Sequence, residues 1–193
     1  MNRPAWITSS FVAGVMSVVL SLPACDSVDR PVAPGSVSKT QPCVTLGNTA
    51  IESTNPGPPD MVFVPVVPSS STTLYLLSVY TVASAASTFE AGVYSNNSGA
   101  PGNLLSETGP KTLSAPATQW NTALLKGYVA LSGGVTYWLA FQATGYQYGP
   151  SGSGATFAYQ AAASYGTLPG SFTGTVQSSP TYAFSIYGTA SCP

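Results

Sequence analysis

The fold is decided by residues 90–105, which read EAGVYSNNSGAPGNLL. Side chains alternate between the two sides of an extended chain. In this stretch Ala91 and Val93 therefore fall on one side, and Glu90 and Tyr94 fall on the other. The alternation ends at a run of Asn, Ser, Gly and Pro, which are the residues that tight turns require. The stretch thus predicts a half-buried strand, a sharp corner and a returning strand.

The corner itself covers residues 96–102. Asn and Gly tolerate positive φ, and Pro fixes φ near about −65°. We expect Gly99 and Gly102 to adopt positive φ. The corner holds neither a charge nor an aromatic ring, so we interpret it as structural. A calcium site that uses the side-chain oxygens of Asn96 and Asn97 is the alternative.

Short runs rich in β-forming residues continue on both sides of the corner. Pro65 cannot donate a hydrogen bond to a ladder, which predicts that its strand lies at a sheet edge or a bulge. No stretch outside the N-terminal leader predicts a helix. Short strands with frequent turn signals indicate an all-β, antiparallel β-sandwich in a single domain. The predicted strands are 43–51, 61–67, 73–82, 89–95, 103–107, 119–125, 128–131, 137–143, 155–162 and 182–189.

The composition excludes several functional classes. Of the 193 residues, 44% are hydrophobic and only 6% are charged, whereas charged residues make up about one-quarter of an ordinary soluble domain. Nucleic-acid binding needs clustered Lys and Arg, and the five such residues of this chain are scattered. The chain has no His, so it lacks the commonest general base and the commonest metal ligand.

Residues 1–24 predict a secretory signal peptide. Arg3 supplies a positive charge, and the apolar run from Phe11 to Leu22 is shorter than the roughly 20 residues of a spanning helix. The run ends in Leu22-Pro23-Ala24-Cys25, which resembles a bacterial lipobox. The resemblance implies a lipoprotein of the bacterial cell envelope, with Cys25 acylated and the chain held at the inner or the outer membrane. An ordinary signal peptide with an incidental Cys25 is the alternative.

Residues 25–42 contain several prolines and small polar residues without apolar periodicity. This is a linker composition, so we expect a tether between the acylated end and a folded domain at 43–193. A short edge strand within the tether is the alternative. Once Cys25 carries lipid, Cys43 and Cys192 remain, and disulfides persist outside the cytosol. We expect these two cysteines to be bridged; two free thiols are the alternative.

Three segments together carry a resemblance to a known type of module. They are VYSNNSGAPGNLL at 93–105, WNT at 120–122 and LSGGVTYWLA at 131–140. The pattern is similar to jelly-roll-like modules of secreted and cell-surface bacterial proteins and of some phage tails. The resemblance covers residues 43–192 and implies a jelly-roll-like sandwich. It brings no catalytic residue with it.

The residues offer little catalytic chemistry. A glycosidase needs two carboxylates that face one sugar bond, and Glu90 and Glu107 are the candidate pair. We interpret both as surface charges on solvated faces. A Ser nucleophile needs a base, and the chain has no His for that role. We therefore expect a protein that is not an enzyme and that has no metal and no cofactor.

Aromatic residues cluster around the loop at 145–154. A core position for these rings is the alternative to a binding site. We interpret Trp120 and Trp138 as core residues. The sequence favours a membrane-anchored, non-catalytic binding or structural module at the cell surface or in the periplasm. A carbohydrate-binding module is the alternative, and a hydrolytic enzyme is the third, least favoured hypothesis. The candidate residues for a glycan or protein ligand are Tyr146, Tyr148, Tyr159 and Tyr165, since tyrosine is enriched at interfaces.

Overall fold

The computed structural model describes the strands of the predicted domain and most of their connections. No segment of this described part forms a helix long and apolar enough to cross a membrane. Cys25, Cys43 and Cys192 lie outside it, and so do Tyr146 and Tyr165. The described residues are 44–51, 55–56, 61–82, 86–114, 118–144, 147–149, 155–161, 166–179 and 183–190.

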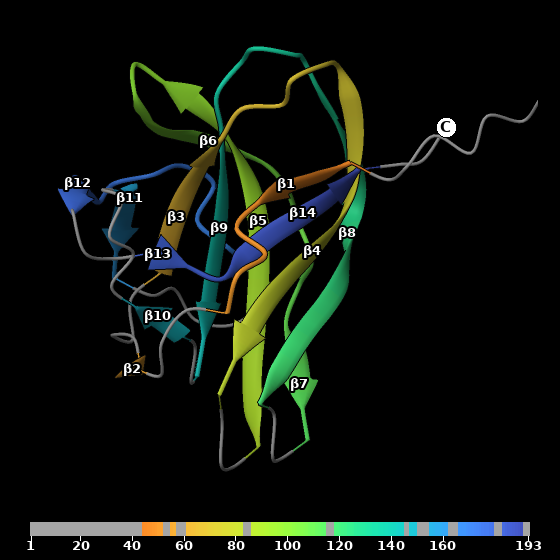
Figure 1. The fold of residues 1–193 in the computed structure, drawn as a ribbon, viewed down its shortest axis with the longest axis vertical. Coiled ribbons are helices and arrows are strands. Elements are labelled where there is room, and N and C mark those ends of the chain that lie inside the picture. Colours follow the sequence, from red (N-terminus) through yellow and green to blue (C-terminus); the bar gives the residue numbers. More distant parts are fainter. Residues whose placement is uncertain are drawn as a thin grey trace, which may run out of the picture. The chain divides into compact units, whose positions relative to one another are not determined.

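The strands form two main sheets (Figure 1). The four-stranded sheet has the order β1-β14-β4-β8, and the seven-stranded sheet has the order β12-β11-β3-β9-β5-β6, with β7 also paired to β5. A small third sheet has the order β13-β10-β2. The strands are β1 Thr45–Gly47, β2 Asn55–Pro56, β3 Met61–Val66, β4 Thr72–Thr81, β5 Ser87–Asn97, β6 Ala100–Glu107, β7 Lys111–Leu113, β8 Gln119–Leu131, β9 Tyr137–Ala143, β10 Gln147–Gly149, β11 Ala155–Gln160, β12 Thr175–Ser179, β13 Ala183–Phe184 and β14 Ile186–Ala190.

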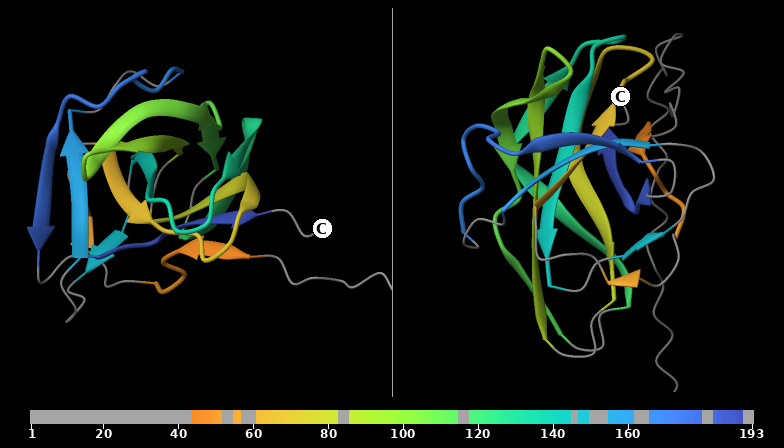
Figure 2. Two further views of the ribbon diagram at one scale, coloured as in Figure 1. Left: turned by 90° about the horizontal axis from the view of Figure 1, so that it is seen from above. Right: turned by 90° about the vertical axis from the view of Figure 1, so that its left-hand side faces the viewer.

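The two main sheets lie face to face as two layers (Figure 2). Every strand pairing within them is antiparallel. The predicted all-β antiparallel sandwich is therefore confirmed. The jelly-roll connectivity stays a prediction.

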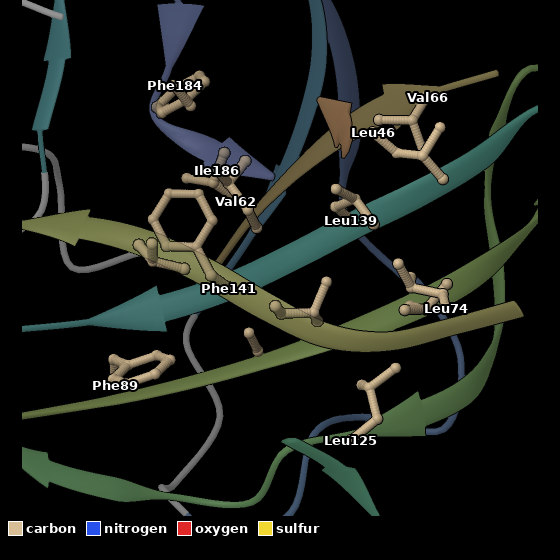
Figure 3. Packing of buried hydrophobic residues seen from close by; sticks show 14 of the residues in the cluster. Leu46, Val62, Val66, Leu74, Phe89, Leu125, Leu139, Phe141, Phe184 and Ile186 are labelled. Atoms are coloured by element: carbon tan, nitrogen blue, oxygen red, sulfur yellow. The ribbon is translucent and has the colours of Figure 1, made fainter. Parts of the chain in front are cut away.

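The main core fills the space between the two layers (Figure 3). Phe89, Ala91 and Val93 all point into it and have no exposed surface, as the alternation along residues 89–94 predicts. Phe141 joins them from β9 of the same sheet, and Ile186 joins them from β14 of the opposing sheet. Burial of each large apolar side chain contributes about 1.5–3 kcal/mol, so this cluster is the principal source of stability.

Strand β8 differs from the sequence prediction because it is one strand rather than two. Its register to β4 pairs Leu74 with Val129 and Leu76 with Leu124. One residue of β4 therefore stands opposite four residues of β8, 125–128. This bulge reaches toward β6, where the amide of Gly127 donates to the hydroxyl of Ser106 at 3.1 Å. A bulge breaks the alternation that marks a strand in a sequence.

Strand β3 lies inside the seven-stranded sheet, so the prediction of an edge strand is wrong for β3 as a whole. The proline nevertheless has a local explanation. Strand β9 pairs along Val62–Val66, but β11 pairs only with Met61, Val62 and Phe63. Pro65 thus lies in the half of β3 that β11 leaves unpaired, where a missing donor is tolerated.

The corner at 96–102 is a two-residue hairpin turn between β5 and β6. Ser98 (φ 52°) and Gly99 (φ 86°) form the turn, so positive φ is confirmed at Gly99. At Gly102 the prediction is wrong: its φ is not positive, and a Cβ there would stand 2.5 Å from the Ser95 Oγ. Asn96 accepts a hydrogen bond from the indole of Trp138 at 2.9 Å, which gives this asparagine a structural role.

Gly99→Val is expected to lower the free energy of unfolding by about 1–3 kcal/mol, because a β-branched residue is forced into positive φ. Ser98→Ala is the matched control in the same turn. Alanine and serine meet the same backbone strain there, so this change should stay within about 0.5 kcal/mol of the original chain. Urea unfolding of both variants measures the difference. Equal stability of the two variants would show that the turn does not need glycine.

Candidate functional site

The outer face of the seven-stranded sheet is covered by residues 166–174, which we call the strap. Two backbone hydrogen bonds join the strap to β6. The amide of Leu104 donates to the Gly170 oxygen at 2.9 Å, and the amide of Phe172 donates to the Gly102 oxygen at 3.2 Å. The Tyr94 hydroxyl donates to the Pro169 oxygen at 2.7 Å. The strap is thus tied to two neighbouring strands, β5 and β6.

A second, smaller core lies between the strap and this face. Leu168 is its contribution from the strap, and it is 1% exposed. Phe63 packs edge-on against both Tyr94 and Phe172, with ring centroids 5.1 and 5.0 Å apart. A Cβ on Gly92 would stand 2.6 Å from the Leu168 Cδ1, so glycine makes room for the strap. The buried members of this second core are Met61, Phe63, Tyr94, Trp138, Ala140, Ala158 and Leu168.

Glu90 lies under the strap and has no exposed surface. Its Oε2 accepts two hydrogen bonds, from the Gln142 Nε2 at 3.1 Å and from the amide of Gly166 at 3.2 Å. Within the described part of the chain, its Oε1 and the Oε1 of Gln142 have no hydrogen-bond partner. The interpretation of Glu90 as a solvated surface charge is therefore wrong. The strand alternation put it on the outer face, and the strap then buried that face.

Glu107 joins three parts of the chain. Its Oε1 lies 2.6 Å from the Lys126 Nζ, on the bulge of β8, and its Oε2 accepts from the amide of Leu168 at 2.9 Å. Its side chain is only 13% exposed, so the prediction of a solvated position is wrong for this acid too. The carboxylate links the strap, β6 and the bulge of β8.

These contacts displace two pKa values. Burial by itself would raise the pKa of Glu107, but the hydrogen bond from Lys126, the bond from the Leu168 amide and the charge of Lys126 outweigh it. The pKa of Glu107 is consequently lowered from its ordinary value of 4.5. Burial raises the pKa of Tyr94 well above 10.0, and the charges of Glu107 and Glu90 add to this effect. The Tyr94 hydroxyl is thus a stable donor to the strap.

The arrangement under the strap supports a structural role for both acids. Each carboxylate accepts a hydrogen bond from a backbone amide of the strap, so both acids contribute to holding the strap on the sheet. No group of three or more His, Cys, Asp or Glu residues that could hold a metal ion occurs in the described ranges.

The outer face of the four-stranded sheet is different, and we call it the open face. The register pairs Tyr80 with Trp120 and Ser78 with Thr122, and it pairs Tyr187 with Ser78. We assign nine residues to the open face: Thr45, Leu76, Ser78, Tyr80, Trp120, Thr122, Leu124, Tyr187 and Thr189. None of them is charged, and all except Ser78 are at least partly exposed.

Three aromatic rings form a continuous row on the open face. The Trp120 ring meets Tyr80 at 5.6 Å and Tyr187 at 4.8 Å between centroids, edge-on in both cases. Tyr187 lies on β14 and Trp120 on β8, with β4 between them, so the indole reaches across a whole strand. The core position predicted for Trp120 is wrong, whereas Trp138 is 1% exposed and its prediction is confirmed.

The predicted ligand residues fall mostly outside what the structure describes. The backbone of Tyr148 lies in β10, but its side chain is outside the described part, as are Tyr146 and Tyr165. Tyr159 is half-buried against the main core, and its hydroxyl accepts from Gln177 at 3.2 Å.

Two shallow depressions lie elsewhere. One of about 330 Å³ is lined by 124–128 of β8, next to the open face. Another of about 470 Å³ lies between β1 and the second half of β3 and is lined by 45–48 and 64–67. The lining of this second depression is mainly apolar, with Val67 half exposed to solvent.

Acidification should weaken the chain partly through Glu107. A carboxylate whose pKa is lower in the folded state than in the unfolded state stabilises the fold above the unfolded pKa. That stabilisation is lost as the pH falls through the lowered pKa of Glu107. Glu107→Gln should therefore lower the free energy of unfolding at neutral pH, and the gap to the original chain should shrink as the pH falls below about 4.5.

Urea unfolding at a series of pH values measures this gap. Lys126→Met is the control, because it removes the ion pair but leaves the bond from the Leu168 amide. It should lose only part of the pH dependence. A gap that stays constant from neutral to acid pH would contradict the role given to Glu107.

No protein-family model matches the chain, and none of the curated proteins compared with it matches either.

Proposed function

We propose that the chain is an exported lipoprotein of the bacterial cell envelope whose folded domain is a non-catalytic binding or structural module. The observation that carries the non-catalytic part is the use made of Glu90 and Glu107. Both carboxylates hold the strap through its backbone amides. A general acid or base must come within hydrogen-bond reach of the reacting group, and these two acids are engaged beneath a covering segment.

A carbohydrate-binding module is the second candidate function. The row of Tyr80, Trp120 and Tyr187 on the open face favours it. Sites for neutral ligands combine aromatic side chains with a small number of polar groups, and this face combines aromatic rings with Ser and Thr hydroxyls. The same row fits the broader proposal of a binding module.

The membrane anchor rests on the sequence Leu22-Pro23-Ala24-Cys25, directly after the apolar run. Cys25→Ser is expected to abolish acylation, because the thiol is the acceptor of the lipid. Metabolic labelling with a clickable palmitate in a bacterial host measures it, with Cys43→Ser as the control that should keep its label. Equal labelling of the original chain and Cys25→Ser would contradict the anchor.

The proposed disulfide between Cys43 and Cys192 has support from neighbouring residues. The amide of Ala190 donates to the Val44 oxygen at 2.9 Å. Val44 comes one position after Cys43, and Ala190 comes two positions before Cys192. In the sequence Cys43 precedes β1 and Cys192 follows β14, and these two strands are paired. Non-reducing peptide mapping of the exported protein should recover the linked pair. Recovery of two alkylated, unlinked peptides would contradict it.

A further inference from the structure

We propose that the open face of the four-stranded sheet binds a chain of neutral pyranose sugars, with Trp120 as its stacking platform. This inference rests on the carbohydrate-binding function put forward above and assigns that function a surface and a ligand class. It also assigns the site to other residues than Tyr146, Tyr148, Tyr159 and Tyr165, which the sequence indicated.

The first step is the position of the rings. Outward-facing residues of β4, β8 and β14 bring Tyr80, Trp120 and Tyr187 together, although they are far apart in the sequence. The Trp120 ring lies between the other two rings, with centroids 5.6 Å from Tyr80 and 4.8 Å from Tyr187. Together they give the sheet a partly exposed aromatic row that runs across the strands.

The second step is rigidity. Edge-to-face contacts hold each ring against its neighbour, and the strand backbone fixes where each side chain starts. Beneath the row, the hydroxyls of Ser78 and Thr122 share a hydrogen bond of 2.7 Å, and Ser78 is 1% exposed. Tyr and Trp lose little conformational entropy on binding, so a row ordered in advance favours affinity.

The third step is the chemistry of the face. Apart from the buried Ser78, its polar groups are hydroxyls of Thr and Tyr, each of which both donates and accepts hydrogen bonds. Sugar hydroxyls do the same, while the C–H groups of a pyranose with equatorial hydroxyls form flat apolar surfaces that suit an aromatic ring. The Nζ of Lys111, on β7, donates to the backbone oxygen of Thr122 at 2.6 Å. An uncharged face fits a neutral sugar better than a uronic acid polymer.

The fourth step is the contrast with the other sheet. The outer face of the seven-stranded sheet carries Trp138 and Tyr94, but the strap covers both, and they are 1% and 0% exposed. On the open face, by contrast, Leu124 is 62% exposed next to the aromatic row.

The test is isothermal titration of the purified full chain with cellohexaose and chitohexaose, and with polygalacturonate as an anionic probe. Saturable binding of at least one neutral hexaose is expected. Trp120→Ala should weaken it about tenfold or more, and Tyr187→Ala should weaken it as well. Leu105→Ala is the matched control, because this apolar side chain is 44% exposed and lies on β6 of the other sheet. It should bind like the original chain.

A cooperative thermal unfolding transition is required of each variant as proof that it is folded. If Trp120→Ala shows no such transition, Trp120→Phe takes its place. A hexaose that binds Trp120→Ala and Tyr187→Ala as tightly as the original chain overturns the site but leaves a carbohydrate-binding module standing. Binding of polygalacturonate alone overturns the neutral ligand class. Absence of binding to every probe overturns both this inference and the carbohydrate-binding candidate. A dimer that depends on Trp120 without sugar binding would make the face a contact between two copies.

Discussion

The strap over the seven-stranded sheet donates two backbone amide hydrogen bonds to acids of that sheet, Glu90 and Glu107. The cover on this face depends on these bonds. Burial of a carboxylate without partners is very costly, and Glu90 has no exposed surface. The amide of Gly166 and the side chain of Gln142 supply its hydrogen bonds. In turn, the strap stays on the sheet because the acids hold it there. Leu168 and Phe172 can then fill the second core.

This dependence gives the two sheets opposite roles. The strap covers the outer face of the seven-stranded sheet, and Glu90 and Glu107 on that face accept hydrogen bonds from the strap. Glu107 extends the same connection to the other layer through Lys126 on the bulge of β8. Among the described residues, the open face of the four-stranded sheet instead keeps a partly exposed aromatic row.

Local patterns predicted much of the fold. Period-two alternation in 89–94 assigned both faces of β5 correctly, and turn residues located the β5–β6 hairpin. The strap could not be found in this way, because residues 166–174 show no alternation. Its decisive bonds also join residues 61 and 76 positions apart. A strand pattern shows which side chains share a face, but it does not show what covers that face.

The same limit explains the errors over individual residues. Glu90 was assigned to the correct face, and its burial was missed because burial depends on the distant strap. Trp120 is large and aromatic, which favours a core position. However, the neighbouring Asn121 is the residue that points inward, with 4% exposure, and the polarity of the residues around it does not predict this. At Gly102 the sequence pattern suggested positive φ, whereas the need for glycine comes from the closeness of Ser95.

Native-state hydrogen exchange at the amides of Gly166 and Leu168 tests the strap most directly. If the two carboxylates hold it closed, both amides should exchange as slowly as the amides of β5, through openings that approach global unfolding. In Glu107→Gln the protection of Leu168 should fall, while that of β14 stays higher. Exchange of both amides in the original chain at the rate of an exposed loop would contradict the account, because the acids would then not hold the strap.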